Sequence, residues 1–162
     1  MTIPSLLTVA VVGFSATLSA GVYWTPDDVK LLVKELKSTN PRTRVSALEE
    51  LGHRGAVRAS EVKEAVSAII EVLKKDRDAN VRKAAATALG QVDPDPQLAV
   101  PALTTALHDK VPTVRIAAAG ALGTLGNAAK ESVPALQELQ KDKDRAVSRA
   151  AMMALRAIRK GR

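Results

Sequence analysis

The sequence predicts an all-α protein, an α-solenoid (superhelix) of about four helical hairpins preceded by an N-terminal hydrophobic segment. Three near-copies of one ten-residue string carry this prediction, and they start 33 residues apart at Val81, Val114 and Val147. In each copy the apolar residues fall at steps 0, 3, 4, 7 and 8, which is one stripe of a helix with 3.6 residues per turn. A fixed spacing of this size is typical of stacked repeats rather than of one compact core.

The composition agrees with closely packed helices. The only aromatic residues are Phe14, Tyr23 and Trp24, so the repeats must pack with Leu, Val, Ile and Ala. The absence of cysteine excludes disulfides and thiolate metal sites. The net charge is +7, of which residues 141–162 carry +6 and the other 140 residues +1, so the basicity is predicted to belong to the last repeat.

Residues 1–24 are predicted to be a signal peptide or a membrane anchor. Residues 1–26 contain no charged side chain, and the run from Ile3 to Trp24 is apolar with scattered Ser and Thr. Leu6–Ala16 followed by small residues suits a signal peptide, whereas the whole run is long enough for an anchor. A buried first helix is the third reading, and Gly13 and Gly21 disfavour it. The first two readings make the protein exported (periplasmic or extracellular) or membrane-anchored.

The repeat domain is expected to span residues 25–162, with repeats at about 25–60, 61–97, 98–130 and 131–162. Thr25 and Pro26 suit the cap and first position of a helix. That helix carries Val29, Leu32 and Leu36 on one face, and a second helix is predicted over about 42–52.

In the second repeat, Ser60 is a predicted N-cap, and the first helix carries the stripe Val66, Ile69, Ile70 and Leu73. Asp76 and Asp78 precede a second helix that starts near Asn80. Gly90 is expected just past the end of that helix, where a residue tolerant of positive φ is favoured.

The third and fourth repeats open with Val100-Pro101 and Val133-Pro134, and each proline is expected in a first helical turn. The stretch 93–96, Asp-Pro-Asp-Pro, is predicted to be a stiff turn before the third repeat. The fourth repeat ends in a basic run.

The pattern Val-Pro-Ala-Leu, then Asp, then Val-Arg-x-Ala-Ala-x-Ala-Leu-Gly resembles the HEAT repeat, in the short form of HEAT-like proteins related to bilin lyases. The third repeat carries it almost completely, and the resemblance covers roughly residues 27–162. It implies that the second helix of each pair lines a concave face. It also implies that a regular set of charged residues bridges neighbouring repeats or caps helices, namely Asp76, Asp109, Asp142, Arg82 and Arg115.

No catalytic, cofactor or metal site is predicted, and the protein is expected not to be an enzyme. His53 and His108 are the only histidines, and neither has the neighbouring Glu of the His-Glu pairs through which some HEAT-like enzymes bind iron. His108 is expected on the surface at a helix end. The sequence contains no nucleophile motif and no Gly-rich phosphate loop between a strand and a helix.

The helical wheel predicts a partner-binding face. With the buried stripe at steps 0, 3, 4, 7 and 8, steps 2, 5, 6 and 9 of the second helices should point away from the core. Step 5 holds Leu48, Ala86, Ala119 and Met152, which makes this face unusually apolar. The candidate binding residues are Lys83, Ile116, Arg149, Met153 and Arg156.

The sequence therefore favours a non-catalytic scaffold that binds a protein or peptide, an acidic one included, on the concave face. One alternative is an accessory subunit of a lyase or isomerase complex, as the bilin-lyase relatives are. Another is a basic nucleic-acid-binding module, which the charge of the last repeat motivates and the missing aromatics and near-neutral remainder disfavour. Membrane contact is expected through residues 3–24 only.

Overall fold

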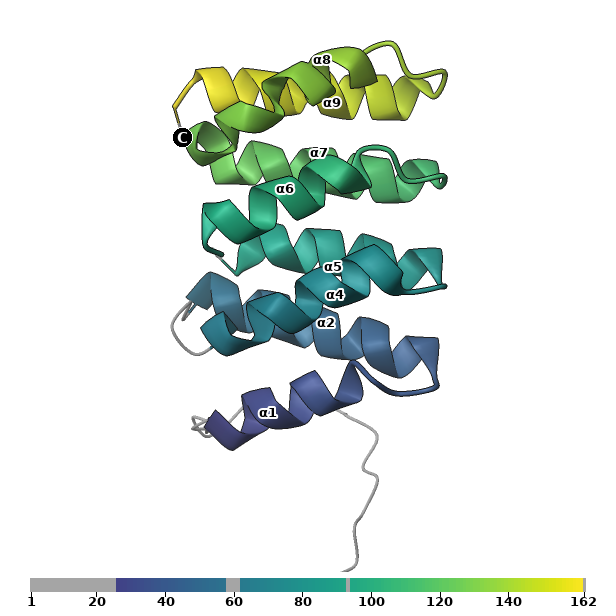
Figure 1. The fold of residues 1–162 in the computed structure, drawn as a ribbon, viewed down its shortest axis with the longest axis vertical. Helices are drawn as coiled ribbons and strands as arrows, with labels where there is room; N and C mark the ends of the chain where they lie inside the picture. The colour runs from purple at the N-terminus through teal and green to yellow at the C-terminus, as the bar shows by residue number, and fades with distance from the viewer. Residues whose placement is uncertain (1–25, 58–61, 93, 162) are drawn as a thin grey trace, which may run out of the picture.

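The computed structural model describes residues 26–57, 62–92 and 94–161, and these ranges contain helices and turns without a strand (Figure 1). Four helical pairs stack along the long axis, which confirms the predicted all-α solenoid. The pairs are α1 (Pro26–Glu35) with α2 (Pro41–Val57), α4 (Val66–Lys75) with α5 (Ala79–Gln91), α6 (Pro96–Ala106) with α7 (Pro112–Leu125), and α8 (Val133–Leu139) with α9 (Arg145–Arg159). Short 3₁₀ helices, η1 (Lys63–Ala65) and η2 (Gly126–Ser132), precede α4 and α8.

The predictions for residues 1–24 and for the caps Thr25 and Ser60 lie outside the described residues. Within the described ranges, no helix combines the length and apolarity that a membrane crossing requires. The signal-peptide and anchor readings therefore stay predictions.

Aspartate side chains start three of the helices. The Asp78 carboxylate accepts a hydrogen bond from the backbone N–H of Asn80 at 2.7 Å, and Asp144 accepts one from Ala146 at 2.8 Å. Asp95 likewise caps α6, where Pro96 takes the first helical position. Each cap satisfies a donor that the first turn of a helix leaves unpaired.

The cap at Asp95 overturns one prediction about the third repeat. Pro101 does not lie in a first helical turn, because α6 begins at Pro96 and Pro101 lies inside it. Asp95 followed by Pro96 supplies both a cap and a first helical residue, so α6 can start there. Pro101 has no N–H to donate to the preceding turn, and because Pro101 is exposed, the carbonyl left without a donor lies on the side of the helix near solvent. Pro134, in contrast, occupies the first turn of α8 as predicted.

The core runs through the middle of the stack. Val81, Leu89, Val114 and Leu122 expose no surface, and the rest of the core is likewise Leu, Val, Ile and Ala. Each second helix packs against the second helix of the next pair as well as against its own first helix. Every inner repeat is therefore stabilised by both neighbours.

Glycines let the second helices approach one another closely. Gly90 does not end a helix as predicted, since α5 continues to Gln91 and positive φ occurs elsewhere, at Gly126 and Gly161. A Cβ at Gly90 would lie 2.9 Å from the Cα of Ala121 in α7. A Cβ at Gly123 would similarly lie 3.1 Å from the Cα of Ala154 in α9. These glycines serve interhelical contact and not helix termination.

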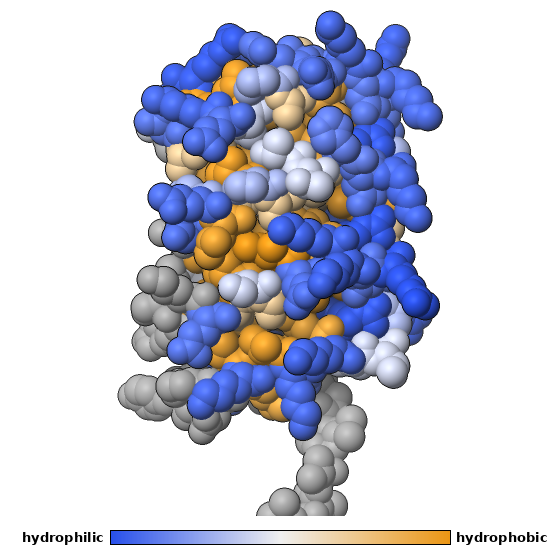
Figure 2. Space-filling model, in the orientation of Figure 1, coloured by the Kyte–Doolittle hydropathy of each residue, from blue (hydrophilic) through white to orange (hydrophobic). Residues whose placement is uncertain are grey.

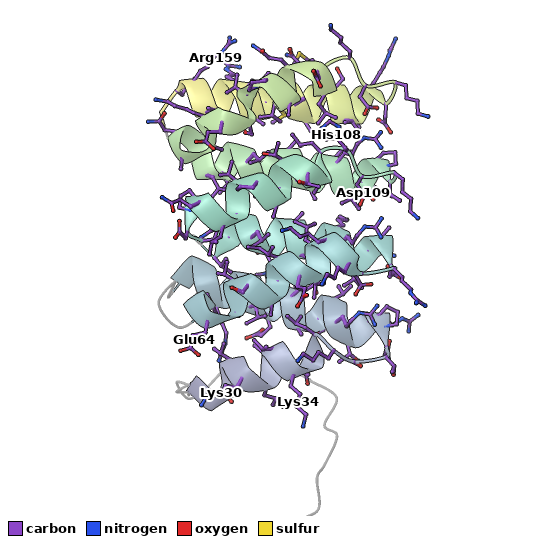
Figure 3. All side chains as sticks on the ribbon, in the orientation of Figure 1. Lys30, Lys34, Glu64, His108, Asp109 and Arg159 are labelled. Atoms are coloured by element: carbon purple, nitrogen blue, oxygen red, sulfur yellow. The ribbon has the colours of Figure 1, made fainter. Side chains whose placement is uncertain are left out.

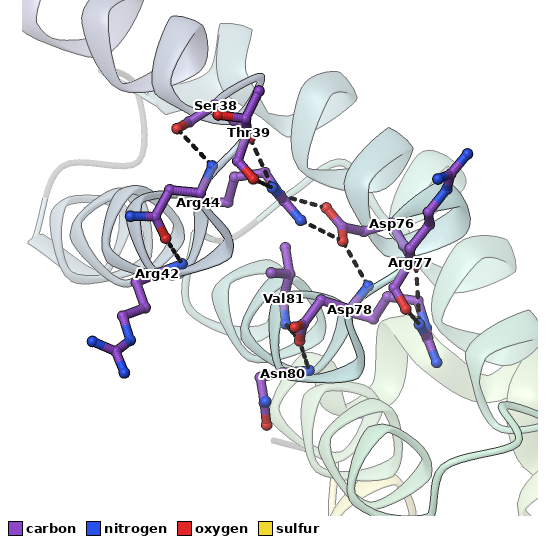
Figure 4. A network of polar contacts seen from close by, with 11 residues as sticks. Ser38, Thr39, Arg42, Arg44, Asp76, Arg77, Asp78, Asn80 and Val81 are labelled. Carbon is purple, nitrogen blue, oxygen red and sulfur yellow. Dashed lines mark hydrogen bonds and ion pairs between the residues drawn. The ribbon is translucent and has the colours of Figure 1, made fainter.

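A ladder of ion pairs joins successive pairs on the side of the turns. Arg44 of the first pair donates from Nε to Asp76 Oδ2 at 2.7 Å and from Nη2 to Asp76 Oδ1 at 2.9 Å (Figure 4). Arg82 holds Asp109 with the same two distances. Arg115 continues the ladder to Asp142, with Nη2 3.0 Å from Oδ1. The predicted bridging of neighbouring repeats is therefore confirmed.

Each arginine also ties its own hairpin together. Arg82 Nη1 donates to the carbonyl of Asp76 at 3.0 Å, and Arg115 Nη1 donates to that of Asp109 at 2.8 Å. The acceptors lie in the turn between the two helices of a pair. Both guanidiniums are buried, so their charge is stabilised by these bonds in place of water.

The ladder lowers the pKa of its aspartates. The hydrogen bond from Arg82 holds the pKa of the Asp109 carboxyl below its usual value, against the opposing effect of burial, and the Val111 N–H adds to the lowering. The pKa of the Asp142 carboxyl is lowered first by the Asp144 N–H and then by Arg115. Both carboxylates are thus stabilised in their charged form.

Alanine at two glycine positions separates helix propensity from packing. Gly120→Ala, where a Cβ would meet no atom within 4 Å, should raise the free energy of unfolding by up to about 1 kcal/mol. Gly90→Ala should lower it by about 1–2 kcal/mol, because the clash with α7 outweighs the better propensity. Urea unfolding followed by far-UV circular dichroism measures both. Equal stabilisation by the two changes would disprove the close contact.

The ladder predicts acid sensitivity. A carboxylate whose folded pKa is lowered stabilises the fold above its unfolded pKa of about 3.9, and this contribution disappears as the pH falls through the lower folded value. Asp109→Ala should cost roughly 2–4 kcal/mol at neutral pH, since it leaves the Arg82 guanidinium buried without its partner. The variant should also lose less stability than the wild type as the pH falls below about 4.

Urea titrations at several pH values test this, with Glu71→Gln as the control. Glu71 pairs with Lys75 on the surface of α4, both side chains being mostly exposed. Its loss should leave the unfolding midpoint nearly unchanged, because water and salt screen such pairs. If the free energy of unfolding of Asp109→Ala fell with pH as steeply as that of the wild type, the ladder carboxylate would not have the stabilising role assigned to it.

Candidate binding face

The side chains that the second helices present to solvent lie at steps 2, 6 and 10 of the repeat, on one face that we call the second-helix face. Steps of four residues advance slightly more than one helical turn, so these positions form a row on each helix. The face comprises Val45, Glu49 and His53 of α2; Lys83, Thr87 and Gln91 of α5; Ile116, Gly120 and Thr124 of α7; and Arg149, Met153 and Ala157 of α9.

The step-5 positions do not belong to this face, which corrects the sequence prediction. Leu48, Ala86 and Ala119 expose no surface. Steps 1, 5 and 9 form a second stripe, and this stripe turns toward the next pair in the stack. Met152 is the exception, with 47% exposure, because no described pair packs beyond α9.

Four of the five predicted binding residues share the second-helix face. Lys83, Ile116 and Arg149 occupy the same position on α5, α7 and α9, and Met153 lies one turn further along α9. Lys83, Arg149 and Met153 are exposed, whereas Ile116 is half-buried. Arg156 lies at step 9, the position of Gly90 and its equivalents, so it belongs to the stripe at the end of the stack and not to the predicted group.

A groove of about 670 Å³ lies between α2 and α5 on this face. Of the predicted residues only Lys83 lines it. The other lining residues, which the sequence analysis did not select, are Val45, Glu49, His53, Asn80, Ala84, Thr87, Ala88 and Gln91. The four-residue spacing of Val45, Glu49 and His53 is the signal that could have identified the α2 side. The polar groups of the groove are the Glu49 carboxylate, the Lys83 ammonium and the amides of Asn80 and Gln91, and its apolar lining includes Ala84 and Ala88.

The described residues offer no assembled metal-binding set. No three of their His, Asp and Glu side chains converge as metal ligands. A hollow of about 620 Å³ near the turns of the second and third pairs includes Asp76, His108 and Asp109, but Arg44 and Arg82 already neutralise both aspartates. His108 is exposed in the turn after α6, as predicted.

The opposite face, formed by the first helices, also carries apolar surface, for which the sequence analysis made no prediction. Figure 2 shows apolar areas along this face, separated by hydrophilic side chains. Leu31 of α1 and Leu98 of α6 are 55% and 52% exposed. A smaller groove of about 250 Å³ between α1 and α4 includes Val33 and Val72. Both faces of the stack therefore carry exposed apolar surface.

Comparison with known proteins identifies the repeat. The sequence matches HEAT repeats over residues 29–122 and 100–161. None of the curated proteins matches it. Among solved structures, an engineered protein aligns with 27% identity and a TM-score of 0.68, covering 83% of this chain and 63% of that one.

Two further structures show the same architecture. A designed armadillo repeat protein in complex with the peptide (KR)4 aligns with 21% identity and a TM-score of 0.68, over 82% of this chain and 64% of that one. This chain thus spans less than two thirds of the engineered and designed proteins. The complex of CpcE and CpcF of phycocyanin lyase from Nostoc sp. PCC7120 aligns with 21% identity and a TM-score of 0.57, over 93% and 70% of the chains.

The stacked helical pairs agree with the HEAT match. Since the match covers more than half of the chain, this protein belongs to the HEAT repeat family.

Proposed function

We propose that this repeat scaffold binds a protein or peptide segment on its second-helix face and performs no chemistry itself. The observation that carries the proposal is an apolar patch over α7 and α9 on that face. Met153 is 72% exposed in α9, and Gly120 at the equivalent position of α7 has open space above it. An exposed apolar patch bordered by polar residues is typical of protein interaction sites.

The charges around this patch favour an acidic partner. Lys83 and Arg149 flank Ile116 on the neighbouring helices, and both are exposed. Cations on either side of an apolar patch attract and orient a segment that combines carboxylates with apolar side chains. Met153 can adapt to different apolar side chains, because its thioether is flexible and polarisable.

The similar structures support a protein partner in general terms. One designed armadillo repeat protein holds a peptide, and CpcE and CpcF form a complex with each other. At 21% identity these likenesses concern the fold. The identity of the partner segment is therefore inferred from the second-helix face alone.

Reversing the character of this face should abolish partner capture. Arg149→Glu with Met153→Asp removes a cation and an apolar contact at exposed positions, so the fold should persist while recovery of the partner falls at least about tenfold. The measurement is a quantitative pull-down with the full chain as bait, in which the recovered proteins are identified by mass spectrometry.

A matched control makes the same two kinds of change on the first-helix face. Lys74→Glu with Leu98→Asp reverses one exposed cation and removes one exposed apolar side chain of α4 and α6. This control should recover the partner like the wild type. Loss of the partner only with the control pair would place the binding site on the first helices and refute the proposal.

A second candidate is an accessory subunit of a lyase or isomerase complex, for which the alignment with the CpcE–CpcF complex over 93% of this chain is the reason. Copurification with a chromophore-bearing protein would favour it.

We further propose that residues 3–24 act as an export signal or an anchor, which N-terminal sequencing of the mature protein tests.

A further inference from the structure

A basic strip follows the turns that join the two helices of each pair. The turns of the second, third and fourth pairs place a cation or a histidine on either side of the ladder aspartate, in the tripeptides 75–77, 108–110 and 141–143. The first turn has a lysine before the equivalent serine. All these flanking residues are exposed, and we call them the turn edge: Lys37, Lys75, Arg77, His108, Lys110, Lys141 and Lys143.

The turns lie one above another along one side of the stack. In Figure 1 they form the right-hand side, and Figure 3 labels His108 and Asp109 there. Nitrogen-tipped side chains project from this side of the molecule. The strip therefore runs parallel to the long axis and crosses all four pairs.

The acids within the strip neutralise it only in part. Asp76, Asp109 and Asp142 are each paired with a ladder arginine, with N–O distances of 2.7–2.9 Å. Asp78 and Asp144 cap helices and remain charged, so they offset part of the positive charge of the turns. Lys75 pairs with Glu71, but no ion pair joins Arg77, Lys110 or Lys143 to an acid of the described chain. These three cations face solvent at consecutive turns.

The spacing of the strip suits an extended polypeptide. Packed helices lie about 8–10 Å apart, so the turn edge offers positive charge at about that interval. A polyproline II segment rises about 3.1 Å per residue with three residues per turn, so every third side chain recurs on one face at about 9 Å. Carboxylates at every third residue of such a segment would meet successive turns.

We infer that the turn edge binds an extended acidic peptide whose carboxylates recur at every third residue, running parallel to the stack. This site is separate from the second-helix face and does not depend on it. Nucleic acid fits less well, because the described residues contain no aromatic side chain on which bases could stack. Duplex DNA also presents a charge about every 1.7 Å, far denser than the strip.

The probe is a fluorescein-labelled peptide of about 12 residues made of repeating Glu-Pro-Ala units, which in extended form is about as long as the stack. Its partner probe has the same composition with all glutamates at one end. Fluorescence anisotropy with the full chain at about 50 mM salt should show the periodic peptide binding several-fold more tightly than the clustered one.

Charge reversal locates the site. The triple variant Arg77→Glu, Lys110→Glu, Lys143→Glu should raise the Kd of the periodic peptide at least about tenfold. The control triple Lys130→Glu, Arg159→Glu, Lys160→Glu changes the net charge equally, away from the intra-repeat turns, and should change the Kd by less than about twofold. Circular dichroism verifies that both variants fold, and Gln at the three turn positions gives a milder version of the test.

Several results would overturn the inference. Equal affinity for the periodic and clustered peptides would show that the spacing of the glutamates does not matter to binding. Tighter binding of a short DNA duplex than of the periodic peptide would assign the strip to nucleic acid. Equal loss in the two triple variants would show that only net charge matters. Variants of Arg149 and Met153 should leave this binding intact, so its failure is distinguishable from failure of the proposed function.

Discussion

The distance between neighbouring second helices is the constraint on which the rest of the stack depends. Gly90 against Ala121, and Gly123 against Ala154, allow backbones to approach where any larger side chain would hold them apart. At that separation an arginine in the first turn of one second helix reaches the ladder aspartate of the next pair. The same arginine still donates hydrogen bonds to carbonyls of its own hairpin. Small residues thus make the polar ladder possible.

The ladder also explains why the two ends of the stack differ from its middle. In the first pair, Ser38 occupies the position of the ladder aspartate, and in the last pair Ser148 occupies that of the ladder arginine. Arg156 stands where the inner pairs have the contact glycine, so a further pair could not approach as closely. A buried ladder charge without its partner would be costly. With serine at these positions, neither end of the stack contains a ladder aspartate or arginine that lacks its partner.

Much of this architecture could be predicted from the sequence, because the repeat period is written in residues such as Val81 and Val114. The bridging role of Asp109 and Arg82 was predictable from their regular spacing. Ala86 and Ala119 were misplaced for one physical reason: a helical wheel with a single buried stripe describes a helix with a single neighbour. A second helix inside a stack has two, and periodicity alone cannot show the second one.

The binding face was predictable to a similar depth. Lys83, Ile116 and Arg149 recur at the same step of the repeat, so the wheel alone places them together. The groove between α2 and α5 could not be predicted, because it depends on how closely two helices from different pairs approach. The apolar surface around Leu98 was also missed, since α6 begins earlier than the prolines suggest.

The charge of the molecule shows most clearly what the sequence conceals. A tally assigns the basicity to residues 141–162, because acids and bases nearly cancel before them. In the structure the opposite charges are not evenly distributed over the surface. The ladder aspartates of the turns pair with buried arginines, and the lysines beside them stay exposed. A near-neutral stretch of sequence therefore folds into a surface with a positive edge. Since this edge and the second-helix face use different side chains, the two proposed sites do not overlap, and occupancy of one leaves the side chains of the other exposed.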